Sequence, residues 1–266
     1  MGGAIMWRLF PLSLLAIVIG AAALLASPAR AITYGSPDGS GHPNVGALIG
    51  EFDGQKELVC SGTLISPTVF LTASHCTAYL EAVGSGAWVT FDSEFDAATS
   101  TLYAGTMHTN PGFNQRQSDS GDIAVVTFAS PVAGITPAGL PAAGVFDAMA
   151  KKGGLHGQTF TAVGYGVHEP VIGGGPPSFP FTSDRWVSTS SFDALNRAWL
   201  RLSQNNATGD GGTCFGDSGG PNFLGSSGTI AAITITGDSM CLATNVVYRL
   251  DTASARSFLD DFVTLP

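Results

Sequence analysis

Three short segments of the 266-residue chain carry a histidine, an aspartate and a serine, in that order. His75 stands directly before Cys76, Asp122 lies midway along the chain, and Ser218 belongs to the hexapeptide Gly-Asp-Ser-Gly-Gly-Pro at residues 216–221. Glycines on both sides of Ser218 permit backbone conformations that a Cβ would forbid, so this serine can occupy a tight turn. A hydroxyl is a weak nucleophile at neutral pH unless a base lies beside it. The pattern therefore favours a fold that brings these three side chains together.

The segments around these residues resemble those of trypsin/chymotrypsin-type serine proteases, in which the triad follows the same chain order. The resemblance extends to the cysteines, because His75 lies 15 residues after Cys60 and Ser218 lies four residues after Cys214. It runs from about Ile32 to the C-terminus. It implies an all-β fold with two six-stranded antiparallel β-barrels and a C-terminal helix.

The resemblance also implies a role for each residue of the triad. Ser218 would be the nucleophile, His75 would take its proton, and Asp122 would hold the imidazole in the required tautomer. The backbone N–H groups of Gly216 and Ser218 would stabilise the oxyanion that forms on the substrate carbonyl. The implied activity is that of a serine endopeptidase, which needs no cofactor.

In the family, the residue six positions before the nucleophile lies at the floor of the substrate pocket, where an aspartate selects Lys or Arg. That position is a glycine here, and desolvating a cationic side chain without a counter-charge is costly. Only Asp210 or Asp238 could supply one. We therefore expect a small or medium neutral residue before the scissile bond. The resemblance assigns five residues to this pocket: Gly212, Thr213, Thr236, Gly237 and Val246.

One position departs from the family pattern. The family usually has Ser-Trp-Gly in a wall of the pocket, and the serine supports the catalytic aspartate, whereas this chain has Ile235, Thr236 and Gly237. Thr234 and Thr236 carry hydroxyls, but strand alternation points them to the face opposite residue 235. The alternative hypothesis is therefore a catalytically weak or inactive protease-like module that binds a partner.

Four cysteines allow three pairings when all of them form disulfides. The resemblance selects Cys60 with Cys76, and Cys214 with Cys241. The chain has no Cys-x-x-Cys motif and its five histidines are scattered, so the sequence does not predict a metal site.

The first 31 residues have the pattern of a signal peptide. Arg8 precedes an apolar run at residues 9–26, and Ala-Arg-Ala at residues 29–31 fits the small-x-small cleavage rule. We expect a secreted protein with no stable membrane association after cleavage. The alternative is a retained anchor, because an apolar run of this length is just sufficient to span a bilayer.

Cleavage after Ala31 would make Ile32 the first residue. In activated members of the family, the new α-ammonium folds inward and pairs with the aspartate that precedes the nucleophile, here Asp217. A buried carboxylate needs such a counter-charge. Thr33 and Tyr34 depart from the family's Ile-Val-Gly-Gly start, so the activation pair of Ile32 and Asp217 is a hypothesis.

Composition is consistent with a β-rich domain over residues 32–266. Only 12 % of residues are charged and 35 are glycines, which is typical of short strands joined by tight turns. We expect the first barrel at about 32–135, the second at about 136–266, and a final helix capped by Asp251 or Thr252. The net charge of −9, without a basic cluster, argues against nucleic-acid binding. We expect a monomer that acts on proteins or peptides.

Overall fold

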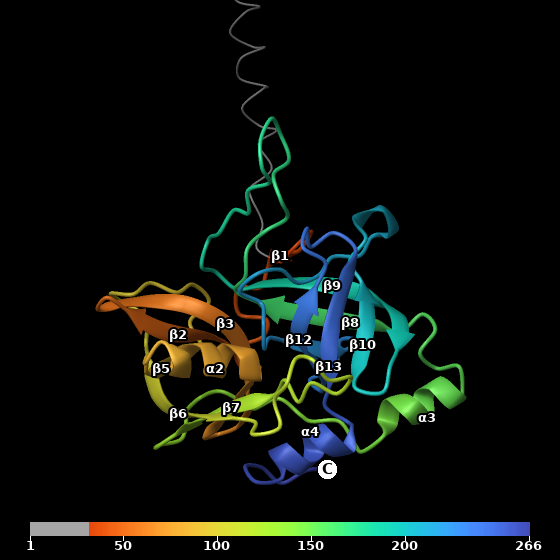
Figure 1. The fold of residues 1–266 in the computed structure, drawn as a ribbon, viewed down its shortest axis with the longest axis horizontal. Coiled ribbons are helices and arrows are strands. Elements are labelled where there is room, and N and C mark those ends of the chain that lie inside the picture. Colours follow the sequence, from red (N-terminus) through yellow and green to blue (C-terminus); the bar gives the residue numbers. More distant parts are fainter. Residues whose placement is uncertain (1–31) are drawn as a thin grey trace, which may run out of the picture.

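The computed structural model describes residues 32–266, so the predicted signal peptide lies outside the described residues. Two β-barrels lie side by side (Figure 1). The first is closed by antiparallel strands in the order β2-β3-β4-β7-β6-β5. Its strands are β2 (Val45–Phe52), β3 (Gln55–Ser66), β4 (Val69–Thr72), β5 (Ala87–Thr90), β6 (Tyr103–Thr109) and β7 (Ala124–Phe128).

The second barrel has the strand order β9-β10-β13-β12-β11-β8 and is closed by pairing of β8 with β9. The short strand β1 (Ser36–Pro37) pairs with β9, so the start of the described chain lies on the second barrel. The two six-stranded barrels confirm the predicted fold. The strands of the second barrel are β8 (Thr159–Gly164), β9 (Trp186–Leu195), β10 (Trp199–Ser203), β11 (Pro221–Leu224), β12 (Ile230–Gly237) and β13 (Thr244–Arg249).

Tight approach of neighbouring strands depends on a glycine in the first barrel. A Cβ on Gly62 of β3 would lie 2.5 Å from the ring of Phe70. Phe70 and Leu71 of β4 are fully buried, and Thr63 pairs with Leu71 across the two strands. The glycine therefore lets the large core side chains of β4 fill the interior, and β4 leads directly to the segment that carries His75.

Within residues 32–266, three α-helices flank the barrels: α2 (Ser74–Ala82), α3 (Val145–Lys151) and α4 (Ala253–Leu259), besides the 3-10 turn η1 (Asn206–Thr208). The Thr252 side chain caps α4 by accepting a hydrogen bond of 3.2 Å from the Ala255 N–H. Just beyond α4, the Phe262 ring lies 5.0 Å from the ring of His108 in β6. The predicted C-terminal helix therefore leads back to the first barrel, although the strands before it belong to the second (Figure 1).

A buried guanidinium joins the two barrels. Arg185, which is 2 % exposed, donates to the carbonyl oxygens of Val45 and Phe91 at 3.0 and 3.1 Å. It also donates to the hydroxyl of Tyr165 at 3.0 Å and to Asp38 Oδ2 at 2.8 Å. All these groups are removed from water, so the ion pair with Asp38 is expected to be costly to break.

The stability of the fold is expected to depend on pH through Asp38. Burial alone would raise its pKa, but hydrogen bonds from His42 and Arg185 outweigh burial and hold the pKa below its usual value. A carboxyl with a lowered folded pKa stabilises the fold above its unfolded pKa, about 4, and this stabilisation is lost as the pH falls through the folded pKa. We expect Asp38→Asn to lower the free energy of unfolding by about 3–5 kcal/mol at pH 7.

Urea unfolding of the wild type and Asp38→Asn at pH 7 and near pH 3 measures this effect. The difference between the two proteins should begin to shrink below about pH 4, where the carboxyl of the unfolded wild type becomes protonated, and should continue to shrink as the pH falls through the lower folded pKa of Asp38. An equal difference at both pH values would contradict the assignment.

Two disulfides are present, Cys60–Cys76 and Cys214–Cys241. They are the pairs that the resemblance implied. The first joins β3 to α2. The second joins the loop before Ser218 to the segment that follows β12, so both brace elements that carry predicted site residues.

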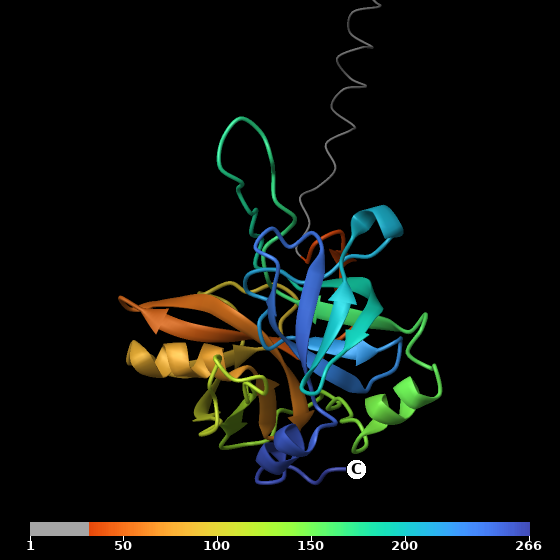
Figure 2. The ribbon, with the colours of Figure 1, turned by 45° about the vertical axis from the view of Figure 1, so that its right-hand side comes forward.

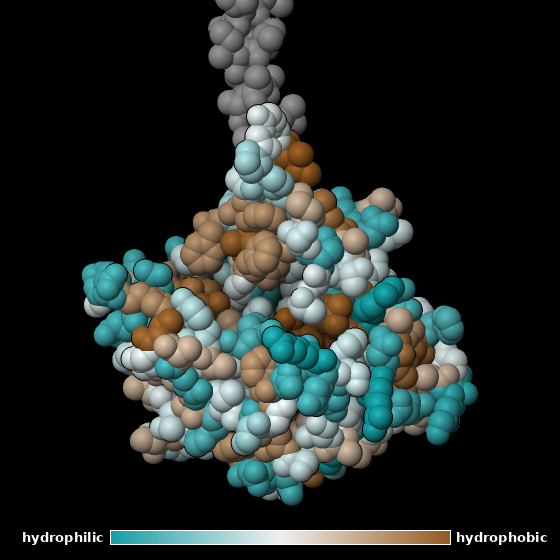
Figure 3. Space-filling view, viewed as in Figure 1, coloured by the Kyte–Doolittle hydropathy of each residue, from teal (hydrophilic) through white to brown (hydrophobic). Residues whose placement is uncertain are grey.

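The connection between β8 and β9 projects away from the second barrel in both ribbon views (Figures 1 and 2). Val171, Ile172 and Phe181 of this loop are exposed. Apolar atoms are visible on the loop in the space-filling view (Figure 3). No helix within residues 32–266 is long and apolar enough to cross a membrane.

Candidate active site

His75 and Asp122 form a two-point contact at the start of α2. The Asp122 Oδ2 atom lies 2.8 Å from His75 Nδ1, and Asp122 Oδ1 accepts a hydrogen bond of 2.9 Å from the His75 backbone N–H. Ala73, the N-cap of α2, has no side-chain capping bond, so Asp122 supplies an acceptor to the first turn of the helix. Asp122 is 2 % exposed. The contact thus fixes the orientation of both the ring and the backbone of His75.

The segment that carries Asp122 is held by its neighbours. Gly121 has a φ of 59°, a left-handed conformation that favours glycine. The Asn110 side chain donates to the Gly121 carbonyl oxygen at 3.0 Å. Ser74, directly before His75, donates its hydroxyl to the Ile123 carbonyl oxygen at 2.7 Å. These bonds tie the approach to β7 to the start of α2.

The loop that carries Ser218 packs against the same end of α2. The Ser218 carbonyl oxygen accepts a hydrogen bond of 2.9 Å from the Ser61 N–H and lies 3.8 Å from Cys76 Sγ. Gly219 has a φ of 78°, and a Cβ there would lie 2.7 Å from the backbone nitrogen of Ala73. The glycine therefore allows the Ser218 loop to approach the helix turn that presents His75.

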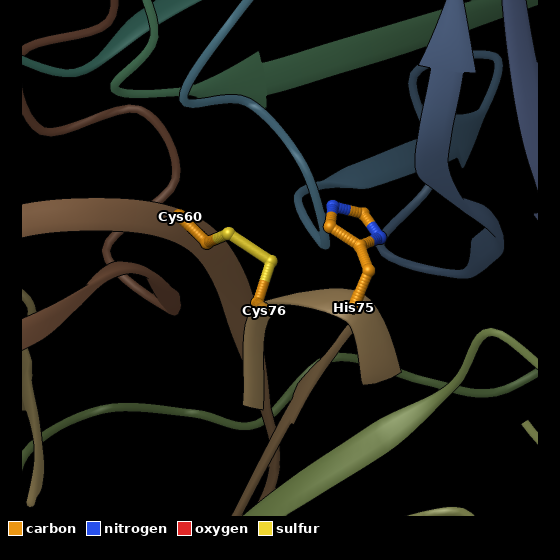
Figure 4. Close-up of side chains that lie close together, drawn as sticks. All are labelled: Cys60, His75 and Cys76. Carbon is orange, nitrogen blue, oxygen red and sulfur yellow. A yellow bond between two sulfur atoms is a disulfide. The ribbon is translucent and has the colours of Figure 1, made fainter. Parts of the chain in front are cut away.

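The Ser218 hydroxyl itself makes no hydrogen bond to His75 or to any other group within residues 32–266. Figure 4 shows the His75 ring beside the Cys60–Cys76 disulfide. The donor atoms of these three residues lie within 4.8 Å of one another. Because both sulfurs are in a disulfide, neither is a thiolate that could bind a metal ion.

Two backbone donors in the Ser218 loop are free. Gly216 has a φ of 96°, and its carbonyl oxygen accepts a hydrogen bond of 3.0 Å from the Ser61 hydroxyl. That bond turns the Gly216 carbonyl toward β3. In the part of the chain that the structure describes, the N–H groups of Gly216 and Ser218 donate to no protein acceptor. An oxyanion site needs backbone donors that are not engaged by protein acceptors.

The Asp217 side chain packs against the segment that follows β8. It is fully buried, and its oxygens accept hydrogen bonds of 2.8 Å from the N–H groups of Gly166 and Cys214. Burial raises the pKa of Asp217 to about 7, although the two backbone donors oppose that rise. Among residues 32–266, no cationic side chain pairs with this carboxyl.

Ile32 is also fully buried, in a cluster with Ala162 of β8 and Trp186 of β9. Asp217 lies near the end of β8 as well, because a Cβ added to Gly164 would overlap its carboxylate. In the intact chain the Ile32 nitrogen is an amide, so it carries no charge to pair with Asp217. Both residues of the predicted activation pair nevertheless border the end of β8.

A cavity of about 350 Å³ lies beside Ser218. Of the five predicted pocket residues, Thr213, Thr236 and Gly237 line it. Val246 instead lines a neighbouring cavity of about 580 Å³, which Asp122 and Trp199 also line. The cavity beside Ser218 is completed by Cys214, Phe215, Thr234, Ile235, Asp238, Ser239 and Cys241.

The two candidate counter-charges are engaged elsewhere. Asp238 lines the cavity beside Ser218, but its Oδ1 accepts from the N–H groups of Met240 and Leu242, and its Oδ2 from those of Ala243 and Thr244. These bonds outweigh the effect of burial and lower the pKa of Asp238.

Asp210 accepts hydrogen bonds from the hydroxyls of Ser191 and Thr208, at 2.7 and 2.9 Å, and does not line the cavity. Asp238 therefore acts as an organiser of its loop, and neither carboxylate is free to meet a cationic side chain.

Ile235 lines both cavities, and Asp122 lines the second of them. Within residues 32–266, Asp122 accepts hydrogen bonds from His75 alone. The Thr234 hydroxyl accepts a bond of 3.0 Å from the Asn222 side chain, and Thr236 is exposed. Neither threonine replaces the donor that a serine at 235 would offer.

Sequence reasoning missed several residues that shape the site. Ser61 holds Gly216, Gly166 holds Asp217, and Phe215 stands exposed at the cavity, with its ring 5.2 Å from that of Phe179 in the projecting loop. Contacts of this kind join segments far apart in the chain and leave no local signal. Phe215, adjacent to Gly216, could have been inferred from its position in the motif.

Two solved structures share the fold of this chain. HL collagenase, solved at 1.7 Å resolution, matches with a TM-score of 0.65 and 17 % identity over 86 % of this chain and 98 % of that chain. Neuropsin, a serine protease expressed in the limbic system of mouse brain, matches with a TM-score of 0.62 and 20 % identity over 86 % and 99 % of the two chains. At these identities the likeness concerns the fold.

No curated protein matches the chain. The family profile described as Trypsin matches residues 42–255, which include all three predicted triad positions. The chain therefore belongs to the trypsin family of serine proteases.

Proposed function

We propose that this protein is a secreted serine endopeptidase that hydrolyses peptide bonds through an acyl-enzyme on Ser218. The observation that carries the proposal is the contact of Asp122 with His75, at 2.8 Å to the ring and 2.9 Å to the backbone, beside a loop with two free N–H donors. A histidine with only a structural role would not require free backbone N–H donors in a neighbouring loop. The signal-peptide pattern and the two disulfides support secretion, because disulfides persist in oxidising compartments.

In the proposed first step, Ser218 Oγ attacks the carbonyl carbon of the substrate and its proton passes to His75 Nε2. Asp122 accepts the Nδ1–H, so the ring keeps Nε2 free to act as a base, and the carboxylate stabilises the imidazolium that forms. The N–H groups of Gly216 and Ser218 donate to the negatively charged oxygen of the tetrahedral intermediate.

The intermediate collapses when the carbon–nitrogen bond breaks and His75 gives its proton to the leaving amine. Water then enters, loses a proton to the same nitrogen and attacks the acyl carbon, and the Ser218 oxygen leaves with the proton returned by His75. No metal or cofactor takes part in this sequence.

The absence of a Ser218–His75 hydrogen bond in the unliganded site is compatible with activity, since catalytic hydrogen bonds often tighten only when substrate binds. The same feature, together with Ile235, favours a second candidate function, a protease-like module that binds a partner without turnover. We expect the active enzyme to act as a monomer on proteins or peptides with an uncharged residue before the scissile bond.

Incubation of the purified secreted protein with a mixture of peptides tests the proposal, with mass spectrometry of the products to locate each cleaved bond. Turnover at defined peptide bonds would support the endopeptidase. Binding of peptides without any cleavage, by protein whose N-terminus is Ile32, would favour the binding module.

The N-terminus is expected to control activity. A chain beginning at Ile32 should have a kcat/KM about a hundred- to a few-thousand-fold higher than one that retains Ala31, because an unpaired buried carboxylate costs about 3–5 kcal/mol. Only in the chain beginning at Ile32 can an α-ammonium pair with Asp217.

The stability of the two chains should also differ with pH. Because burial raises the pKa of Asp217 to about 7, the chain that retains Ala31 keeps its full stability below about pH 4 and loses stability as the pH rises through 7. Peptide hydrolysis at pH 8 and unfolding curves at pH 4 and 8, measured on both chains, check this prediction. Equal activity and equal pH dependence would contradict the ion pair.

Ile235→Ser is expected to raise kcat about tenfold, because a hydroxyl at this position would donate to the Asp122 carboxylate, and a hydrogen bond to a charged group contributes about 1.5–3 kcal/mol. The gain should appear in kcat, since the hydroxyl stabilises the Asp122–His75 pair during proton transfer. Ile235→Ala is the control, because it removes the same side chain and adds no donor. Equal rates for the two variants would count against the missing hydrogen bond.

A further inference from the structure

The space next to Gly212 is filled by the side chain of Gln204. Gln204 directly follows β10 in the chain and is fully buried. A Cβ added to Gly212 would overlap the Gln204 side-chain oxygen and would lie 2.5 Å from the Gln204 Cβ and 2.7 Å from its Cδ. No side chain can therefore be placed at 212 while Gln204 keeps its position.

Gln204 is held firmly in that position. Its Oε1 accepts a hydrogen bond of 2.8 Å from the N–H of Thr213, a residue that lines the cavity beside Ser218. Its backbone N–H donates to the Ala243 carbonyl oxygen at 3.0 Å, and its Nε2 donates to the Thr244 carbonyl oxygen at 3.4 Å. The carboxamide therefore bridges the segment before Ser218 and the start of β13.

The walls above this position offer hydrogen bonds without charge. Thr213, Thr234 and Thr236 line the cavity, and within residues 32–266 no protein acceptor takes the proton of any of their hydroxyls. The Thr234 oxygen already accepts from Asn222, so its proton is free to point toward a ligand. Among the described residues, Asp238 is the only charged one along the cavity lining, and its oxygens accept from four backbone N–H groups.

We infer that Gln204 is a specificity-determining residue. It occupies the place where a charged side chain at position 212 would lie, and it leaves a cavity rimmed by hydroxyls, whose carboxylate, Asp238, already accepts four hydrogen bonds from its own loop. The substrate class is a peptide with an uncharged, hydrogen-bonding side chain, above all glutamine or asparagine, before the scissile bond. This inference rests on the proposed endopeptidase function.

Substitutions at position 212 test whether Gln204 blocks this site. Gly212→Asp alone should give no cleavage after Lys or Arg, because the new carboxylate has no room. Gly212→Asp combined with Gln204→Ala opens that room, and kcat/KM for Lys and Arg substrates should rise at least 100-fold over that of Gly212→Asp. Equal cleavage after Lys and Arg by the single and the double variant would overturn the role of Gln204.

A nearly isosteric variant avoids the loss of packing in the double variant. Gln204→Glu keeps an acceptor for the Thr213 N–H and adds a negative charge at the same place, so cleavage after Lys and Arg should rise at least tenfold at pH 8. Gln55→Glu makes the same chemical change at an exposed position in β3 and should leave the preference unchanged. No difference between the two glutamate variants would also overturn the inference.

A peptide library profiled with the wild type and these variants gives the readout, and fluorophosphonate labelling of each variant reports whether its site is formed. Wild-type cleavage mainly after Gln or Asn supports the inference. A labelled wild type that prefers Lys, Arg, Glu or a large apolar residue contradicts the inference and leaves the endopeptidase intact. A folded wild type starting at Ile32 that is neither labelled nor active contradicts both.

Discussion

Ser218→Ala is expected to lower kcat for peptide hydrolysis by about a million-fold, the size of loss seen when a triad serine is removed. Ser218 Oγ forms the covalent bond of the acyl-enzyme, so no neighbouring group can replace it. A residual rate of about a thousand-fold or more above the uncatalysed reaction should remain, because the N–H groups of Gly216 and Ser218 still stabilise the oxyanion.

Hydrolysis of a fluorogenic peptide by the wild type and the variant measures the loss, and urea unfolding of both verifies the fold. Ser226→Ala is a matched control, since Ser226 is exposed on the second barrel and should keep the wild-type rate. A Ser218→Ala protein that retains more than about a tenth of the wild-type kcat would be incompatible with an acyl-enzyme on this residue.

Asp122→Asn is the second large effect, with an expected fall in kcat of about ten-thousand-fold. An asparagine can donate from its amide to His75 Nδ1, which leaves the proton on Nε2 and removes the base that Ser218 needs. Asp122 contacts the His75 ring at 2.8 Å and the His75 backbone N–H at 2.9 Å, so the amide of an asparagine at this position would lie within hydrogen-bond distance of His75 Nδ1. The loss should therefore fall on kcat, with KM changed much less.

Asp119→Asn tests whether the loss belongs to the carboxylate beside His75. Asp119 precedes Asp122 in the same segment and accepts a hydrogen bond of 2.7 Å from the Tyr248 hydroxyl. Its replacement removes one negative charge without touching His75, so kcat should change less than tenfold. Similar losses for both variants would indicate a general effect of charge or folding.

The parts of the structure that the sequence predicts are those with a local signal. Strand alternation and glycine turns indicate the two barrels, and the cysteine spacing carries the resemblance that implies Cys60–Cys76 and Cys214–Cys241. The glycines around Ser218 likewise predict a tight turn, and Gly216 and Gly219 have positive φ values of 96° and 78°.

The position of Val246 could not be predicted in this way, because it depends on strand register. Thr234 pairs with Val247 and Thr236 pairs with Val246, so Ile235 is an extra residue in β12. A bulge of this kind changes the pairing register of every residue beyond it, and the sequences of β12 and β13 contain no pattern that predicts it. Val246 consequently lines the cavity that Asp122 lines, and not the one beside Ser218.

Gln204 illustrates a further limit, whereas the role of Asp238 has a local signal. Gln204 meets Gly212 only because β10 and the Ser218 loop are neighbours in the folded barrel, and a single sequence contains no trace of that contact. Asp238 opens a turn, and an aspartate that accepts from the N–H groups two or more residues later is a known turn pattern. The sequence could therefore have indicated that Asp238 organises its own loop.

The central claim is that His75, Asp122 and the free N–H groups activate Ser218. Fluorophosphonate labelling of the mature secreted protein, with its N-terminus sequenced on the same sample, tests this claim most directly. Stoichiometric modification of Ser218, located by peptide mass, is expected in chains that begin at Ile32, and none is expected in Ser218→Ala. Folded chains beginning at Ile32 that remain unlabelled, or that are labelled at another serine, would contradict it.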